Sequence, residues 1–510
     1  MRAVFFQVAL KPFAVAKKIN LVSLLYNGCS LPIRFHTAMN TLPAAPLPTP
    51  SRWLPLLLAI AIFMQMLDAT ILNTALPKMA ADLGESPLNM QSAIIAYALT
   101  LAIMMPLSGF LADRYGTRKL FLGAMVVFMV GSVLCAAASS LNMLVVARVI
   151  QGMGGAMLTP VARLTMMRAY DKSQLLSVIN YAVMPALIGP VLGPVVGGYL
   201  VDYASWHWIF LLNVPIGLLG LVFALRIMPD FNAPGGHFDA IGFALFGAAA
   251  FGLSFAFELI THPGAQLFSI LMALCGIAAL ALYWRHALHS REPLYGLDLL
   301  SVRTFRIGLV GNLFSRLGMS ALPFLLPLLL QVAFGYPASV AGWMLAPLAL
   351  AAIAAKPAIK PLMSRFGYRR ILVANTRLIG ILIMCLALPS ADTPLWLLLP
   401  LLFALGAANS LQFSGMNTLT IADLRSRQAS SGSSLMGVNQ QLAISFGIAI
   451  GALLLQSFSH LNQGHSLHNA FRYTFVLVGL MTFASSWVFA RLHPHDGDNL
   501  VHKVADDHPA

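Results

Sequence analysis

Fourteen apolar runs, each long enough to cross a lipid bilayer, dominate this sequence. A membrane-spanning helix needs about 20 mostly apolar residues. Only 9% of the 510 residues are charged, whereas an ordinary soluble domain carries about 25%, so the chain cannot cover a globular surface. The sequence therefore predicts an all-α membrane protein with many spans. The predicted spans are residues 54–76, 90–112, 120–138, 141–162, 175–201, 209–228, 240–259, 267–284, 307–332, 338–359, 371–388, 394–411, 435–458 and 471–492.

Basic residues are distributed unevenly among the loops that join these runs. The net charge of +14 would suggest nucleic-acid binding in a soluble chain, but in a membrane protein Lys and Arg mark the cytoplasmic loops. Loops after even-numbered spans are rich in both, whereas loops after odd-numbered spans hold only Lys78 and Arg472. This asymmetry predicts an even number of spans, with both termini in the cytoplasm.

A short motif occurs twice and divides the chain into two halves. Arg-aromatic-Gly-x-Arg-basic follows the second span at residues 114–119 and the tenth span at residues 365–370. Such internal duplication is typical of secondary transporters. The pattern predicts two six-helix bundles with an extra helix pair inserted between them.

Loops and tails set the expected domain boundaries. The first residues meet the criteria for a targeting segment poorly, so translation from Met39 is an alternative to a true leader. The predicted parts are a cytoplasmic leader at 1–51, the first bundle at 52–228, the inserted hairpin and linker at 229–299, the second bundle at 300–492 and a cytoplasmic tail at 493–510.

One carboxylate lies deep inside an apolar run. Asp68 falls within the first span, where a carboxylate near mid-bilayer costs about 2.5–3.5 kcal/mol at insertion. Gln65 and Asn73 lie broadly on the same helical face. Intramembrane polar groups generally face the bundle interior or a water-filled cavity. Asp68 is therefore the first candidate for a proton-binding group, and a purely structural carboxylate is the alternative.

An arginine in the fourth span is the candidate partner of this carboxylate. Arg148, Gln151 and Gly155 share one helical face at i, i+3 and i+7. Arginine keeps its charge and offers several donors, so it can hold a carboxylate. We expect Arg148 to tune or gate proton transfer at Asp68; the alternative is a structural anchor.

Four groups of residues occur along the chain as recognisable motifs. They are Asp113-Arg114-Tyr115-Gly116 with Arg118 and Lys119; Arg148 with Gln151, Gly152, Gly154 and Gly155; Gly189-Pro190 with Gly193-Pro194 and Gly197-Gly198; and the runs 67–77 and 206–217. Together they resemble the major facilitator superfamily, and within it the branch of fourteen-spanner drug:proton antiporters. One Gly-rich motif would be weak, but this set in this order is specific, and the resemblance covers roughly residues 52–491.

The resemblance implies roles for two of these groups. The first is a cytoplasmic gate, in which Asp113 locks the two halves at the start of the thirteenth span, after Ser430–Ser434. The second is an antiporter motif that closes the first bundle and limits ion leak; close packing alone is the alternative. The gate residues are Gly109, Asp113, Arg114, Gly116 and Arg118, and the antiporter residues are Gly189, Pro190, Gly193, Pro194, Gly197 and Gly198.

A substrate cavity between the halves should be lined by polar residues within the spans. Arg316 in the ninth span suggests an anionic substrate, unless it pairs structurally. A cavity for cations would carry a second acid, and Glu258 lies too near a helix end to be a good candidate. The candidate cavity residues are Gln65, Asn73, Gln151, Arg316 and Asn439.

Several function classes lack support in the sequence. It contains no Gly-x-x-x-x-Gly-Lys-Ser/Thr loop for ATP, no nucleophile–base constellation, and no zinc-ligand spacing among its C-terminal histidines. We therefore expect no enzyme activity, no metal and no cofactor, with the proton-motive force as energy source. The expected partners are the lipid bilayer, a small-molecule substrate and protons, without nucleic acid, and the chain is expected to be a monomer.

The resulting prediction is a proton-coupled exporter in the bacterial inner membrane that works by alternating access. It would export small amphipathic compounds as a drug:H+ antiporter. One alternative is a proton-coupled exporter of organic acids or metal-chelate anions. A second alternative is a membrane sensor that uses the same fold without transport.

Overall fold

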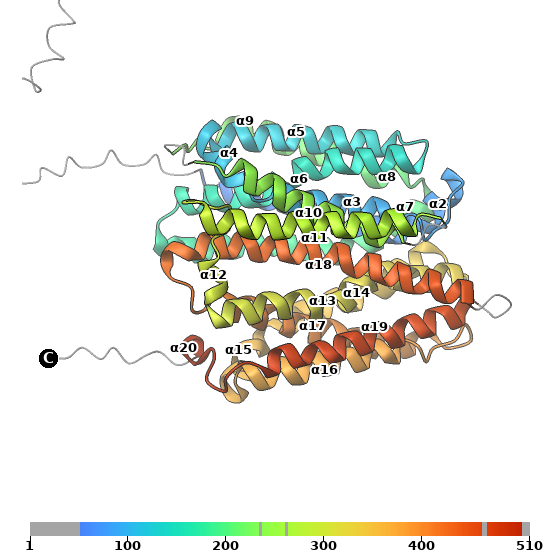
Figure 1. Cartoon of the computed structure of the whole chain (residues 1–510). Coiled ribbons are helices and arrows are strands. Elements are labelled where there is room, and N and C mark those ends of the chain that lie inside the picture. Colours follow the sequence, from blue (N-terminus) through green and yellow to red (C-terminus); the bar gives the residue numbers. More distant parts are fainter. Residues whose placement is uncertain (1–50, 234–236, 261–263, 462–466, 502–510) are drawn as a thin grey trace, which may run out of the picture. The chain divides into compact units, whose positions relative to one another are not determined.

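The computed structural model describes residues 51–233, 237–260, 264–461 and 467–501. In these ranges the chain forms helices and no strand (Figure 1). The predicted leader lies outside the described residues except for residue 51, and so does the alternative start at Met39. The end of the predicted tail, residues 502–510, also lies outside them.

The first bundle is built from long helices joined by short turns. Its long helix α7 packs along α1, and α5 packs along α6. The elements are α1 (Leu54–Ile71), η1 (Leu72–Thr74), α2 (Leu76–Leu83), α3 (Gln91–Met104), α4 (Leu107–Tyr115), α5 (Thr117–Ala136), α6 (Leu141–Ala169), α7 (Lys172–Tyr203), α8 (His207–Leu211) and α9 (Asn213–Ile227).

The inserted hairpin packs against one helix of each bundle. Its helices α10 (Ala240–Leu259) and α11 (Gln266–His289) lie together, and α10 contacts both α3 and α18. The second bundle follows as α12 (Asp298–Ser301), α13 (Arg303–Leu328), η2 (Leu329–Ala333), α14 (Ala338–Ala354), α15 (Lys356–Phe366), α16 (Tyr368–Cys385), η3 (Leu395–Leu397), α17 (Leu398–Ile421), α18 (Ser426–Leu461), α19 (Leu467–Ala490) and α20 (Asp498–Val501).

The all-α membrane fold is confirmed, whereas the number of spans stays a prediction. Among the described residues, ten helices are long and apolar enough to cross a membrane, and two bent helix pairs raise the number to twelve. The two other predicted spans, residues 175–201 and 371–388, lie largely in α7 and α16. Three arginines give α16 an unusual charge for a span: Arg369, Arg370 and Arg377.

Prolines stand at the breaks of both bent pairs. The α3–α4 pair bends by 57° at a turn that ends in Pro106, and the α14–α15 pair bends by 54° just before Pro357. Proline removes a backbone donor and clashes with the preceding turn, so it kinks a helix. The two halves therefore repeat the same bend in their second helical span.

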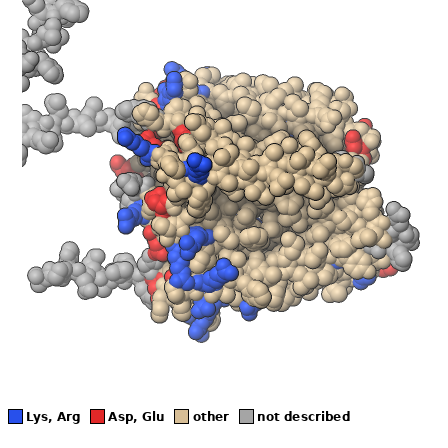
Figure 2. Space-filling view, in the orientation of Figure 1, with Lys and Arg blue, Asp and Glu red and all other residues tan. Residues whose placement is uncertain are grey.

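On the surface, charge gathers at the ends of the helices (Figure 2). In the view shown, Lys and Arg gather at the end where α12, α15 and α20 lie, and the band between the two ends is almost free of charge (Figure 2). A wide uncharged band is what an apolar bilayer core requires. The basic end corresponds to the loops after even-numbered spans.

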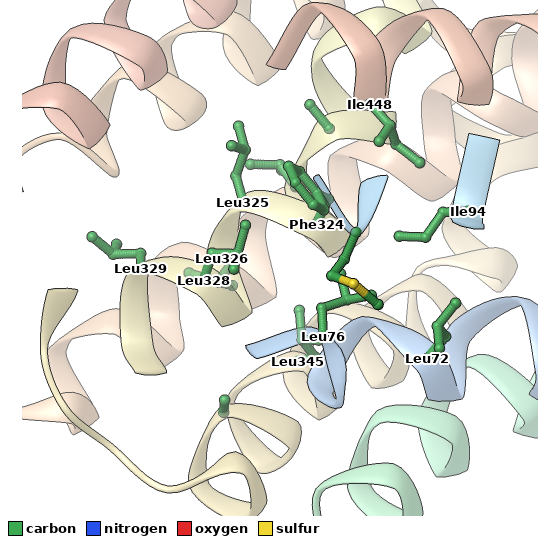
Figure 3. Close-up of a cluster of buried hydrophobic side chains, with 14 of the residues drawn as sticks. Leu72, Leu76, Ile94, Phe324, Leu325, Leu326, Leu328, Leu329, Leu345 and Ile448 are labelled. Atoms are coloured by element: carbon green, nitrogen blue, oxygen red, sulfur yellow. The ribbon is translucent and has the colours of Figure 1, made fainter. Parts of the chain in front are cut away.

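The two bundles meet in an apolar cluster at the other end, near α2. Leu72 and Leu76 of the first bundle share this cluster with Phe324 and Leu345 of the second (Figure 3). Burial of such side chains stabilises a contact by roughly 25 cal/mol per Å² in water. In the bilayer, close packing supplies most of the stabilisation instead.

Hydrogen bonds reinforce the same end. Asp202 of α7 accepts from the backbone N–H groups of Ala338 at 3.2 Å and Ser339 at 2.8 Å, so it caps α14 of the other bundle. Gln331 donates to the Thr74 carbonyl at 3.0 Å, and the Trp343 indole to Tyr199 Oη at 3.1 Å. The four hydrogen bonds that join the described parts of the two bundles all lie here. The hydrogen bonds between the bundles are thus concentrated at this end, while α3 and α18 also pack against each other.

A carboxylate fastens the base of the inserted hairpin. Asp239 caps α10 by accepting from the Gly242 N–H at 2.8 Å, and it also accepts from the Leu294 N–H at 3.0 Å. The His286 ring at the end of α11 lies 2.7 Å away. Burial raises the pKa of Asp239, but the two N–H groups and the histidine lower it more, so its pKa lies below the ordinary value of 3.8.

Replacing Asp239 by asparagine should therefore loosen the hairpin base. Asparagine offers one acceptor oxygen where the carboxylate offers two, so it can keep only one of the N–H bonds from Gly242 and Leu294, and we expect a loss of about 0.5–1.5 kcal/mol near neutral pH. Because the folded-state pKa is lowered, the stabilisation by Asp239 is complete above about pH 4 and is lost as the pH falls through the folded value. Melting temperatures of the detergent-solubilised protein over a pH series measure this.

The matched control is Asp171→Asn, because Asp171 precedes α7 without a side-chain cap bond. The control should melt like the wild type at every pH. A destabilisation of Asp239→Asn that stayed constant down to about pH 3, well below the ordinary aspartate pKa, would contradict the assignment.

Candidate functional site

A carboxylate in α1 lies at the centre of a hydrogen-bond network inside the first bundle. Asp68 is 1% exposed. Arg148 Nη1 of α6 donates to Asp68 Oδ2 at 2.7 Å. Gln151 Nε2 of α6 and Asn213 Nδ2 of α9 donate to Asp68 Oδ1 at 2.8 Å and 2.9 Å. The predicted pairing of Asp68 with Arg148 is present, and the carboxylate links three helices.

Two residues of α5 extend this network. Ser132 Oγ accepts from Gln151 Nε2 at 2.7 Å and from Asn213 Nδ2 at 3.2 Å. Cys135 Sγ lies 3.6 Å from Gln151 Oε1 and donates to it. Gln151 and Ser132 are both fully buried. The carboxylate and its amide partners are therefore enclosed by α1, α5, α6 and α9.

The arginine is enclosed as completely as the carboxylate. Arg148 is 1% exposed, its Nε donates to the Ala93 carbonyl of α3 at 3.3 Å, and its Nη1 donates to Gln151 Oε1 at 2.6 Å. Its guanidinium carbon lies 4.1 Å from the centre of the Tyr97 ring, which is cation–π distance. A buried pair of this kind is stable only while both charges are present, because removing one leaves the other unpaired.

Glycines bring α5 and α6 close enough to form the network. A Cβ on Gly131 would lie 2.5 Å from the backbone of Gln151, and one on Gly154 would lie 2.5 Å from the Phe128 nitrogen. No real Cβ tolerates such contacts, so both positions require glycine. Small residues at helix contacts allow this close approach in membranes. The approach places Ser132 within hydrogen-bond distance of Gln151.

The predicted antiporter motif packs α7 against α1, beside Asp68. A Cβ on Gly189 would lie 3.0 Å from Met66 Cβ, and one on Gly193 would overlap the Thr70 hydroxyl. Thr70 Oγ1 donates to the Gly189 carbonyl at 3.5 Å, at the long limit for such a bond.

The end of the motif reaches the second bundle. A Cβ on Gly197 would lie 2.5 Å from the Ile71 carbonyl of α1, whereas one on Gly198 would overlap the Ala338 carbonyl of α14. Pro194 lies at the same contact, because its carbonyl accepts from Thr74 Oγ1 at 3.4 Å. Gly197, Gly198 and Pro194 therefore lie where α7 meets α1 and α14, and Pro190 lies in the same helix.

The predicted gate loop is fastened within the first bundle. Asp113 pairs with Arg168 of α6 at 2.5 Å, and Arg118 donates to the Leu225 carbonyl. Gly116 has φ +91°, which favours glycine, and an added Cβ would overlap the Asp230 carboxylate. The Arg114 guanidinium lies over the Phe110 ring. Gly109 lies in open space, because no atom lies within 4 Å of a Cβ added there.

Asp113 therefore has a different partner from the one expected. The sequence interpretation placed Ser430–Ser434, at the start of α18, opposite this carboxylate. In the structure, Ser434 Oγ instead lies 3.2 Å from Tyr295 Oη of the linker before α12. The two bundles are fastened at the α2 end in this conformation, and Asp113 binds within its own bundle.

The predicted cavity residues are not gathered in one place. Gln65 accepts from Thr159 Oγ1 of α6 at 2.5 Å, and Gln151 belongs to the Asp68 network. Asn73 is buried in η1. Asn439 donates to the Leu309 carbonyl at 3.0 Å within the second bundle.

Arg316 lies in α13 of the second bundle and takes no part in the Asp68 network. Its guanidinium carbon lies 4.9 Å from the centre of the Phe413 ring of α17. The Nε atom is buried and has no hydrogen-bond partner among the described residues. Asn312, one turn before it, donates to Asn417 at 3.3 Å. Arg316 is thus a cation in a polar region of the second bundle.

The sequence interpretation missed some contributors to the Asp68 network. Asn213 figured only as part of a family signature, and Ser132 and Tyr97 were not singled out. Asn213 interrupts an apolar run, which is the same signal that identified Asp68. Serine and tyrosine are common enough in membrane helices that composition alone does not identify them.

The network depends on the negative charge of Asp68. Protonation of Asp68 would remove the negative charge that holds Arg148 and would weaken the hydrogen bonds from Gln151 and Asn213. Since these partners come from α6 and α9, such a change would alter how α1 packs on both helices. In the described part of the chain, no group of three or more His, Cys, Asp or Glu side chains could hold a metal ion.

Known proteins resemble the chain in sequence and in fold. The Major Facilitator Superfamily profile matches residues 58–294 and 308–506. The "Putative multidrug resistance protein MdtD" of Serratia proteamaculans (strain 568) is 42% identical over 447 residues, which is 86% of this chain and 93% of that protein. The protein of the same name from Pectobacterium atrosepticum is 40% identical over 453 residues, 88% and 97% of the two chains.

A solved structure extends the likeness to the fold alone. The crystal structure of a D-xylose-proton symporter matches with a TM-score of 0.63 and 15% identity, over 86% of this chain and 97% of that one. The profile match, the close relatives and the shared helical fold agree over most of the sequence. The chain belongs to the Major Facilitator Superfamily.

Proposed function

We propose that this chain is a proton-coupled efflux transporter, a drug:H+ antiporter that exports small amphipathic compounds across the bacterial inner membrane. The observation that carries the proposal is the enclosed Asp68–Arg148 pair, since ionisable groups inside a membrane protein commonly mark proton pathways. The name of the relatives, multidrug resistance protein, supports outward transport of drug-like compounds.

The energetics of proton entry suit this role. One proton that moves down a membrane potential of ~100 mV supplies about 2.3 kcal/mol, which is comparable with the strength of hydrogen bonds to charged groups. Binding a proton at Asp68 would loosen Arg148 and Asn213, and releasing it would restore them. Each proton can therefore move the first bundle between two packing arrangements.

Alternating access would use the contact between the bundles near α2. That contact is held by the Asp202 cap on α14 and by the surface around Gly198. Rocking of the two halves about a fixed site is the usual motion of duplicated transporters. In the cycle proposed here, this end separates while the opposite end closes.

The same proposal includes the location, the oligomeric state, the partners and the energy source of the protein. The chain works as a monomer in the bilayer with both termini in the cytoplasm, and it binds protons and a small-molecule substrate but no nucleic acid. Energy comes from the proton-motive force, without a cofactor or metal, and the substrate leaves chemically unchanged because the protein is a transporter and not an enzyme.

A substrate screen in an efflux-deficient host tests the proposal. Expression of the wild type should lower the accumulation of at least one amphipathic drug, and expression of Asp68→Asn at equal level should not. If the two proteins protect the host equally, proton coupling at Asp68 is wrong. If the wild type moves no compound at all, the result favours the alternative of a membrane sensor that does not transport.

Arg316 favours a second candidate function, the export of organic acids or metal-chelate anions. A half-buried cation whose buried Nε lacks a partner among the described residues is suited to hold an anionic group of a substrate. Arginine binds carboxylates through paired donors. The same proton coupling would serve this substrate class.

The Arg316→Gln variant distinguishes the two substrate classes. If anions are carried, uptake of a labelled carboxylate into everted vesicles with an imposed pH gradient should fall about tenfold or more, which corresponds to ~1.4 kcal/mol. Efflux of a cationic dye should not fall. The matched control is Arg377→Gln, since Arg377 also lies near a ring but donates to Ser486. Equal losses for both cargoes would contradict an anion-binding role.

A further inference from the structure

A cavity of about 660 Å³ lies between the first bundle and the inserted hairpin. Its walls are three helices: α3 and α6 of the bundle, and α10 of the hairpin. This volume lies within the ~300–1,000 Å³ of pockets that hold drug-sized molecules. We call it the lateral pocket, and it is separate from the Asp68 network and from Arg316.

Apolar side chains line each wall at intervals of four residues, which places them on one helical face. The three stripes run along the three helices from a common end. They are Ile95, Leu99 and Ile103 on α3, Val145, Val149 and Met153 on α6, and Phe251 and Phe255 on α10.

Polar side chains collect at one end of the lateral pocket. Glu85 and Asn89 precede α3, Asn142 lies at the start of α6, and Glu258 lies at the end of α10. Because α10 runs antiparallel to the other two walls, these positions all fall at the same end of the helices. The pocket is therefore amphipathic along its length, with a polar head region and an apolar body.

The polar head region carries the negative charge that a cation-binding site needs. Its two acids are Glu85 and Glu258, and none of the residues that line the pocket is a Lys, Arg or His. Asn89 donates to Glu85 at 3.1 Å, and Glu258 also has a partner of its own. A cationic group placed here would gain two carboxylates, whereas a phosphate would meet like charges.

An unpaired hydroxyl supports a ligand independently of the two acids. Ser254 lines the pocket, is 1% exposed, and its Oγ has no hydrogen-bond partner among the described residues. A buried polar group without a partner costs about 1–3 kcal/mol. Ser254 lies one turn before Glu258, on the same face of α10, so one ligand could contact both.

We propose that the lateral pocket binds single-chain cationic amphiphiles, with the ammonium head between Glu85 and Glu258 and the apolar part along the stripes of α3, α6 and α10. The binding itself does not depend on proton-coupled export, so the two proposals can fail separately. The sequence interpretation had set Glu258 aside as a helix-end residue, but the pocket gives it a position beside a second acid.

Three related fluorescent probes test the assignment on the purified full-length protein in uncharged detergent. They are the trimethylammonium derivative of diphenylhexatriene, the uncharged parent and the propionate derivative, and protein-free micelles give the background. We expect saturable binding of the trimethylammonium probe. Binding of the propionate probe should be at least about tenfold weaker, a difference of ~1.4 kcal/mol. Equal binding of the cationic and anionic probes would overturn the proposal.

Substitutions at the pocket residues test whether the trimethylammonium probe binds in the lateral pocket. Glu85→Gln combined with Glu258→Gln should weaken binding of the trimethylammonium probe about tenfold or more, whereas Asp392→Asn, in an exposed loop, should not. Val149→Trp should fill the pocket and abolish binding. Its control is Val146→Trp on the same helix, since Val146 is exposed and does not line the pocket.

Two outcomes would overturn the site. One is equal binding by the Val149→Trp and Val146→Trp proteins, provided that both melt like the wild type. The other is displacement of the probe by phosphatidylethanolamine as effectively as by dodecyltrimethylammonium, because the pocket would then be a phospholipid site. If Val149→Trp fails to fold, the combined Glu85→Gln and Glu258→Gln variant still decides the question, because unchanged binding of the trimethylammonium probe there would overturn the site.

Discussion

Replacing Asp68 by asparagine is expected to destabilise the protein by about 3–5 kcal/mol, because the buried Arg148 guanidinium loses its counter-charge. Arg148 stays charged under all accessible conditions and is 1% exposed, so water cannot replace the carboxylate. The loss should be seen as a lower melting temperature of the purified protein in detergent, measured together with the amount of folded protein.

A second substitution and a surface pair provide the controls. Asp68→Asn combined with Arg148→Met removes both charges and should recover much of the lost stability, since a neutral pair needs no compensation. Asp113→Asn breaks the partly exposed pair with Arg168 and should cost no more than about 1 kcal/mol. If the double variant melts below Asp68→Asn, the two residues do not act as a charge pair.

Replacing Gly342 by valine is expected to separate the two bundles near α2. A Cβ at this position of α14 would overlap the Pro194 carbonyl of α7, and backbone cannot move aside as a flexible side chain can. Overpacking of a tight contact costs typically ~1–3 kcal/mol. We expect the conformation in which this contact is closed to lose most of its population. Each ~1.4 kcal/mol of added cost lowers that population about tenfold relative to the open conformation.

Spin labels report the separation directly. Labels at Tyr203 and Val332, both exposed, should give a longer distance distribution in Gly342→Val than in the wild type by electron–electron resonance. Gly123→Val is the control, because Gly123 lies within α5 with no atom within 4 Å of an added Cβ. An unchanged distribution in a folded Gly342→Val protein would show that this contact does not hold the bundles together.

The charged pair could be predicted from the sequence because charges are rare in apolar runs. Asp68 and Arg148 each interrupt a span, and two opposite charges buried in neighbouring helices must pair or be expelled. The helical fold followed from the length of the apolar runs, and the duplication and the inserted hairpin were predicted from the motif repeated at residues 114–119 and 365–370.

The other members of the network could not be predicted, because they depend on which helices pack together. Asn213 meets Asp68 only because α9 lies beside α1, and Ser132 meets Gln151 only because Gly131 and Gly154 let α5 approach α6. Hydropathy places a helix in the membrane, but it does not determine its neighbours or its rotation. Those are set by packing between small residues.

Loop contacts were hard to predict for a related reason. Asp113 was assigned to the start of α18 on family resemblance, yet it binds Arg168 while the bundles are joined at the α2 end. A transporter has more than one conformation, and a sequence does not specify which of them a given contact belongs to. Glu258 was dismissed from its place in the chain, although the fold brings it beside Glu85.

The most direct measurement of the proposed function is proton movement coupled to substrate. Everted membrane vesicles from an efflux-deficient host are energised until a pH-sensitive acridine dye is quenched, and a compound found in the screen is then added. Wild-type vesicles should release protons, seen as dequenching that saturates with the compound, and Asp68→Asn vesicles with equal protein should not. Transport of the compound by the wild type without dequenching, or equal dequenching by Asp68→Asn, would contradict proton coupling at Asp68.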